Sequence, residues 1–213
     1  MKKIILNVCV LLALVMLGPL LAADNAVILT PGSGVTMRST DVGGGLQAMR
    51  PIVYQLVTPS ANFTRPADTT AYAVGDLIAN STTAGSVTPL SWTVNDFSAE
   101  GVSIRRVRIN KSTTGATAPN FRLHLYTTSP TVANGDNGAF SSTSVGYFCT
   151  MDVNMPTTDP FSDGGWGFGV PNNGVACDVV PAASTVYGLV EARGAYAPGN
   201  AEVFTVLLEV TKP

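Results

Sequence analysis

The sequence predicts an all-β protein, an antiparallel β-sandwich of jelly-roll type with an extended N-terminal arm. Three observations lead to this prediction. Charged residues make up only 12% of the 213 residues, about half the usual quarter for a soluble domain. The chain contains 21 Gly and 14 Pro, which punctuate it as turns between short strands do. From Pro51 onward apolar residues follow a period of two, and no long amphipathic helical pattern is present.

The first segment, Met1–Ala22, has the three parts of a secretory signal. Lys2 and Lys3 precede an apolar run that ends at Leu17, and a Gly-Pro pair then interrupts it. Because a membrane-spanning helix needs about 20 unbroken apolar residues, we expect no stable membrane span here. Several interpretations stay open: a cleaved export signal, an appended or misannotated start, or an accidental apolar extension.

Residues 23–50 are expected to form an extended Gly-rich arm, and residues 51–213 a single β-sandwich domain. The arm contains the sequence PGSG from Pro31 and three consecutive glycines from Gly43, so it can form short strands at most. Arms of this kind reach across to neighbouring subunits in assemblies. Without a partner, the same segment would be a disordered tail.

Within the domain, strands are expected where apolar residues alternate or cluster between turn residues. Their number, roughly eight, suits two packed antiparallel sheets. In chain order the seven with clear bounds are Pro51–Thr58, Leu90–Val94, Gly101–Asn110, Asn120–Tyr126, Val145–Val153, Thr185–Ala192 and Ala201–Thr211.

The strand over Gly101–Asn110 changes phase along its length. Val102 and Ile104 alternate in one phase, and Val107 and Ile109 in the other. A strict period of two cannot bury both pairs, so the pattern predicts a β-bulge near Arg105 and Arg106.

The next strands differ in how clearly they alternate. In Asn120–Tyr126, Phe121 and the two following leucines are expected on one face, with Arg122, His124 and Tyr126 on the other. Val145–Val153 lacks clean alternation, which suggests a strand covered on both faces. Pro156–Asn173 is rich in Gly and Asp and is expected to be a long loop.

No catalytic, cofactor or metal site is predicted, and we expect a protein that is not an enzyme. His124 is the only histidine, and the sequence identifies no nucleophile or carboxylate partner for it. We therefore interpret it as a sheet-face or interface residue.

Cys149 and Cys177 lack the close spacing of a zinc site. They could form one disulfide in an exported protein, or remain free, buried thiols in a reducing cytoplasm. The second interpretation is preferred here.

Oxygen ligands occur in Asn134–Gly138 and at Asp159 and Asp163. Neither group follows the spaced-acid pattern of a calcium loop, so ordinary turn chemistry is the better explanation.

Charge argues against nucleic acid as a partner. The formal net charge is −2, and loss of Lys2 and Lys3 with the leader would make it −4. Binding to phosphates requires clustered positive charge. The only dense basic cluster is formed by Arg105, Arg106 and Arg108.

An aromatic pair, Trp166 and Phe168, lies in the sequence GGWGFG. Flat exposed rings could stack on sugars. Alternatively they could pack under their own loop or fill a subunit interface, which is the commoner use of such rings.

Four segments resemble structural proteins of tailed bacteriophages. Arg65–Ser81 (RPADTTAYAVGDLIANS) resembles a module of such proteins, and Phe121–Ser142 and Thr185–Val210 are similar to the same kind of virion protein. Ala23–Gln47 is similar to their N-terminal arms. No segment carries a mechanistic signature, so the resemblance names no reaction.

The resemblance implies a structural virion protein at the capsid surface, in particular a capsid decoration or cement protein. Its partners would be the major capsid protein and copies of itself, as a trimer or dimer, and the three arginines could contact an acidic capsid surface or remain solvated at a sheet edge. Phage capsid proteins assemble in the host cytoplasm, which conflicts with a leader. The alternative is an exported, secreted carbohydrate-binding or adhesive β-domain.

Overall fold

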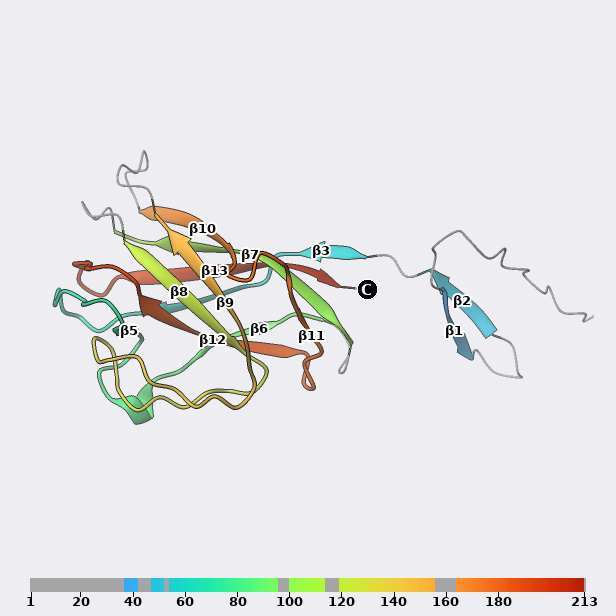
Figure 1. Cartoon of the computed structure of the whole chain (residues 1–213), viewed down its shortest axis with the longest axis horizontal. Helices are drawn as coiled ribbons and strands as arrows, with labels where there is room; N and C mark the ends of the chain where they lie inside the picture. Colours follow the sequence, from blue (N-terminus) through green and yellow to red (C-terminus); the bar gives the residue numbers. More distant parts are fainter. Residues whose placement is uncertain are drawn as a thin grey trace, which may run out of the picture. The chain divides into compact units, whose positions relative to one another are not determined.

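The computed structural model describes residues 37–41, 47–51, 54–95, 100–113, 119–155 and 164–212. The chain divides into two compact units, Met1–Ile52 and Val53–Pro213 (Figure 1). In the first unit, β1 (Met37–Asp41) pairs antiparallel with β2 (Gln47–Pro51). Part of the predicted arm thus forms a two-stranded sheet. The rest of the arm, and the leader, lie outside the described residues.

The second unit is built from strands that form one eleven-stranded sheet. Every pair of strands in it is antiparallel, so the predicted all-β, antiparallel class is confirmed. Within the described ranges, no helix is long and apolar enough to cross a membrane. The elements are β3 (Gln55–Val57), β4 (Ser60–Thr64), β5 (Leu77–Ile78), a 3₁₀ turn (Ala84–Ser86), β6 (Leu90–Thr93), β7 (Val102–Lys111), β8 (Asn120–Tyr126), β9 (Tyr147–Asn154), β10 (Gly165–Pro171), β11 (Cys177–Val179), β12 (Thr185–Ala192) and β13 (Val203–Lys212).

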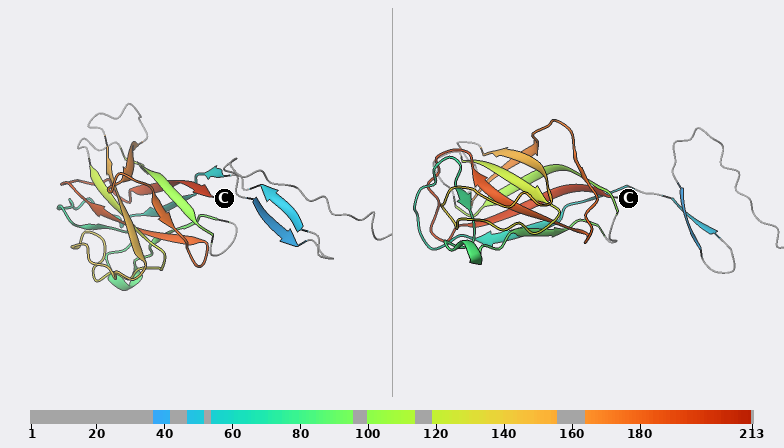
Figure 2. Two further views of the ribbon diagram at one scale, coloured as in Figure 1. Left: turned by 45° about the vertical axis from the view of Figure 1, so that its right-hand side comes forward. Right: turned by 60° about the horizontal axis from the view of Figure 1, so that its bottom comes forward.

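The eight main strands pair in a nested order. β4 pairs with β13, β6 with β12, β7 with β10 and β8 with β9. Further pairing of β13 with β7 and of β12 with β8 gives two layers, β4-β13-β7-β10 and β6-β12-β8-β9 (Figures 1 and 2). Rolling one long hairpin into two facing sheets produces such an order, which is consistent with the predicted β-sandwich; the jelly-roll type stays a prediction. β10 also pairs with β9, so the layers are continuous at one edge.

The hydrophobic core lies between the two layers. Trp92 of β6 donates a hydrogen bond from its indole nitrogen to the carbonyl of Val206 on β13, over 3.0 Å. Phe121 of β8 packs edge-on against Phe204 of β13, with ring centroids 5.4 Å apart. These buried contacts fix which face of each layer points inward, and therefore which side chains the opposite faces present to solvent.

The predicted β-bulge is present. Arg106 lies opposite Glu209 and Ile104 lies opposite Val210, so Arg105 has no partner on β13. Ile104 and Val107 are both fully buried. The extra residue thus corrects the phase between them, and it leaves Arg106 and Arg108 on the outward face.

Two expectations about the strands are wrong. In β9, alternate residues from Cys149 to Val153 are buried and those between them are half-buried, so the strand alternates cleanly and only its inward face lies in the core. Pro51–Thr58 is interrupted: β2 ends at Pro51 and β3 begins at Gln55.

Candidate functional site

β10 displays its aromatic residues on the outward face of the first layer. Gly165, Gly167 and Gly169 are buried, while Phe168 is 43% exposed and Trp166 is half-buried. A Cβ on Gly167 would lie 2.7 Å from the carbonyl oxygen of Asn154, and one on Gly169 would overlap the backbone of β9. β10 therefore passes so close to β9 that Gly167 and Gly169 have no room for a larger side chain. The prediction of a loop is wrong here, because these glycines serve close packing within a strand.

The strand register places the aromatic pair beside polar side chains of β7. Trp166 lies opposite Asn110, and Phe168 lies opposite Arg108. The two rings meet edge to face, with centroids 4.9 Å apart. Between these strands runs a groove of about 460 Å³, which we call the aromatic groove; it is lined by Arg108, Asn110, Lys111, Gly164, Gly165, Trp166 and Phe168.

The charges around this groove are unequally balanced. Arg106 donates to Glu209 over 2.9 Å and stacks on the ring of Phe168 at 4.9 Å. Lys111 forms a buried ion pair with Glu202 at 3.5 Å. Among the described residues, no acidic side chain pairs with Arg108, so the described side chains that line the groove carry an unmatched positive charge. Because β7 is paired on both sides, the interpretation of its arginines as charge at a sheet edge is wrong.

Two polar atoms of the aromatic groove are buried without a hydrogen-bond partner among the described residues. They are the Nε of Arg108 and the Oδ1 of Asn110, two residues apart on the same face of β7. Buried polar atoms in native proteins are generally paired. A polar ligand in the groove could pair with both atoms, because one is a hydrogen-bond donor and the other is an acceptor.

His124 lies on β8, on the face expected from the sequence, and is largely buried. Its Nε2 lies 2.7 Å from Oε2 of Glu191 on β12, and its ring stacks on Phe140 at 4.2 Å. Glu191 also accepts a hydrogen bond from Arg193. Sequence reasoning missed the carboxylate partner because only the register of β8 against β12 brings the two together. Burial lowers the pKa of His124 below its ordinary value of 6.5, despite the opposing effect of Glu191.

Acidification should destabilise the domain through His124. Since its pKa is lowered on folding, the unfolded chain binds the proton first as the pH falls, so stability is retained above about pH 6.5 and lost below it. We expect His124→Gln, which can still donate to Glu191, to remove this loss between about pH 7 and about pH 5.5. Urea unfolding of both proteins across this range measures it. Parallel pH profiles of the two proteins would contradict the assignment.

A second cluster of polar side chains involves Arg65, the first residue of the phage-like segment Arg65–Ser81. Arg65 and Asp136 form an ion pair at 2.9 Å, with both side chains fully buried. Arg65 also donates to the hydroxyl of Tyr72, and that hydroxyl donates to Asp136 over 2.6 Å. The backbone N–H of Ala79 donates to the same carboxylate over 2.7 Å. Because these groups are inaccessible and mutually paired, they hold the segment in place.

The oxygen-rich loop Asn134–Gly138 is explained by this pairing. Both carboxylate oxygens of Asp136 are already hydrogen-bonded, so the loop does not present them to a cation. In the part of the chain that the structure describes, no group of three or more His, Cys, Asp or Glu side chains could hold a metal. Asp159 and Asp163 lie outside the described residues.

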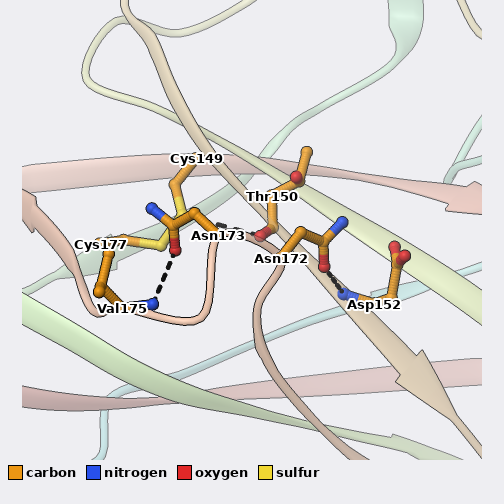
Figure 3. The surroundings of a disulfide bond; sticks show 7 residues. All are labelled: Cys149, Thr150, Asp152, Asn172, Asn173, Val175 and Cys177. Atoms are coloured by element: carbon orange, nitrogen blue, oxygen red, sulfur yellow. Dashed lines mark hydrogen bonds between the residues drawn. A yellow bond between two sulfur atoms is a disulfide. The ribbon is translucent and has the colours of Figure 1, made fainter.

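Cys149 and Cys177 form a disulfide (Figure 3). Their Cα atoms are 5.9 Å apart, within the usual range for a disulfide. The bond joins β9 to β11, and β11 pairs with β7. The turn before β11 is also held on β9, since Asn172 accepts from the N–H of Asp152 over 2.9 Å. The preferred interpretation of free thiols is therefore wrong.

Exposed apolar side chains gather near β3 and β11. Tyr54, 73% exposed, and Val180, 59% exposed, line one groove of about 740 Å³. We call it the apolar groove; it is lined by Tyr54, Gly101, Val102, Ser103, Arg105, Asp178, Val179, Val180 and Thr211. Clustered apolar surface of this kind marks interaction sites.

Known proteins offer little similarity to this chain. No protein-family model and no curated protein matches it. One solved structure, titled "Structure of infectious bursal disease virus Gx strain", aligns with 82% of this chain and 44% of that chain, at 10% sequence identity and a TM-score of 0.15. The chain spans less than half the length of that protein, and this TM-score gives no support to a shared fold.

Proposed function

We propose that this chain is a structural protein of a virus particle, in particular a decoration or cement protein of a phage head. It acts by binding the capsid shell and copies of itself, without turnover. The phage-like segments suggest the particle, and the apolar groove is the observation that carries the binding role. Its exposed Tyr54 and Val180 lie together in one concave surface, which suits the core of a protein–protein contact.

The mechanism is geometric. The β-sandwich is a stiff body, because both layers share one core and a disulfide joins β9 to β11. Many modest contacts, repeated at every equivalent position of a symmetric shell, add up to strong attachment.

Weakening the apolar groove should reduce attachment without unfolding the domain. We expect the double variant Tyr54→Ser, Val180→Asp to co-sediment with capsids of the encoding virus at least about tenfold less, because it places polar groups in the contact. Its melting temperature should stay unchanged, since both residues are exposed. The matched control is Val74→Asp, an equally exposed valine (62%) outside this groove.

Mass spectrometry of purified particles provides the complementary test and identifies the N-terminus of the protein. Absence of the protein from particles would overturn the proposal. Equal co-sedimentation of the double variant and the wild type would overturn the role of the apolar groove.

A second candidate, an exported adhesive β-domain, is favoured by one observation, the Cys149–Cys177 disulfide. Disulfides form and persist outside the cytoplasm. A virion protein could acquire this bond after release from the cell, whereas an exported protein would acquire it during secretion. Detection of the oxidised, leader-free protein in the medium of cells that produce no particles would favour the exported domain.

A further inference from the structure

We propose that the aromatic groove between β7 and β10 is a binding site for an acidic saccharide, a pyranose that carries a carboxylate. This inference concerns a different groove, which shares no lining residue with the apolar groove, and it does not depend on the proposed docking function. It rests on the chemistry that the groove presents: rings, a positive charge without an acidic partner among the described residues, and a buried donor and acceptor.

The rings supply the apolar part of sugar recognition. A pyranose has C–H groups on its faces, which pack on the flat side of an aromatic ring and exclude water from it. Phe168 is 43% exposed, and Trp166 stands 4.9 Å from it at an interplanar angle of 76°. The two rings thus stand at a steep angle to each other. A sugar ring can stack on the face of one of them and contact the edge of the other.

Asn110 and Arg108 supply the polar part. The Oδ1 of Asn110, which has no partner among the described residues, can accept a hydrogen bond from a sugar hydroxyl, and the Nε–H of Arg108, likewise without one there, can donate to a sugar oxygen. Since the inward-pointing glycines fix β10 on β9, both rings are held rigidly beside these two side chains. The site is therefore organised before any ligand arrives.

The charge of the groove selects the class of saccharide. The charges of Arg106 and Lys111 are matched by Glu209 and Glu202, respectively. Arg108 has no acidic partner among the described residues, and a planar guanidinium suits a carboxylate. The volume of about 460 Å³ lies within the range of roughly 300–1,000 Å³ that is usual for small-ligand sites.

The test uses the full-length protein on an immobilised glycan panel that contains uronic and sialic acids together with neutral counterparts lacking the carboxylate. Titration calorimetry with the best-bound glycan then gives the affinity. We expect binding to carboxylate-bearing glycans, and a loss of about tenfold to a hundredfold in Arg108→Gln and of similar size in Trp166→Ala.

The matched control is Arg105→Gln, which removes an exposed arginine from the same strand outside the aromatic groove and should leave the affinity unchanged. Thermal melts of each variant show whether a loss reflects unfolding; if Trp166→Ala is unstable, Arg108→Gln alone decides. Three results would overturn the inference: no glycan bound, equal binding of neutral and acidic glycans, or equal losses in Arg105→Gln and Arg108→Gln. Capsid co-sedimentation is measured separately, so failure of this inference leaves the docking proposal standing.

Discussion

Replacing Asp136 with Asn should lower the free energy of unfolding by about 3–5 kcal/mol, the usual cost of leaving one member of a buried ion pair without its partner. The side chains of Asp136 and Arg65 are both fully buried, and they lie 2.9 Å apart. Asn keeps the shape of the side chain and removes its charge, so the guanidinium of Arg65 loses its only buried counter-ion among the described residues. Chemical denaturation with urea gives the difference directly.

Asp68 offers the matched control. It also lies near Arg65, at 3.5 Å, but its side chain is 36% exposed. Solvent screens this pair, and Asp68→Asn should change the stability by less than about 1 kcal/mol. If Asp136→Asn costs no more than Asp68→Asn, the buried pair does not hold the phage-like segment in place.

Removing the disulfide should have an effect of similar size. The two cysteines are 28 residues apart, and closing a loop of that length is worth about 3–4 kcal/mol through the entropy of the unfolded chain. We expect the double variant Cys149→Ser, Cys177→Ser to lose this amount in a denaturant titration. Ser at both positions adds a hydroxyl in a buried site, so part of any larger loss would come from that change.

A reductant separates the two contributions. Dithiothreitol should lower the free energy of unfolding of the wild type by about 3–4 kcal/mol, the contribution of loop closure. It should leave the free energy of unfolding of the double variant unchanged. A wild type that unfolds at the same denaturant concentration with and without the reductant would contradict the assigned role of the bond.

The sequence predicted the structure best where neighbouring residues along the chain determine which face of a strand a residue occupies. Strand β8 was predicted with its bounds, because Phe121, Leu123 and Leu125 alternate without interruption. The bulge at Arg105 followed from the change of phase between Ile104 and Val107. In both cases the signal is local, since burying one face of a strand requires a period of two.

Pairings across the fold could not be predicted in this way. Arg65 and Asp136 are 71 residues apart in sequence, and only the docking of the Asp136 loop against β5 brings them together. His124 and Glu191 meet through the register of two strands, and Cys149 and Cys177 through the pairing of β11 with β7. Composition gives no information about register.

The candidate site was predicted only in part: the sequence singled out Trp166 and Phe168 as rings that could stack on sugars, but placed them in a loop. A high glycine content suggests a loop, because glycine is common in turns. In this segment the glycines are Gly165, Gly167 and Gly169. Their spacing carries the correct signal: every second residue is a glycine, and the residues between them are Trp166 and Phe168. A period of two in glycine predicts a strand that lies tightly against a neighbour and displays large side chains on its other face.

The nested order of the strands also constrains when the protein can fold. β13, the most C-terminal of these strands, lies inside the first layer between β4 and β7, and β12 lies inside the second layer between β6 and β8. A nascent chain that ends before Val203 therefore lacks an interior strand, with β4 and β7 left without their common neighbour. Because both layers depend on such distant segments, folding must wait until β13 has left the ribosome and should be slow once it starts.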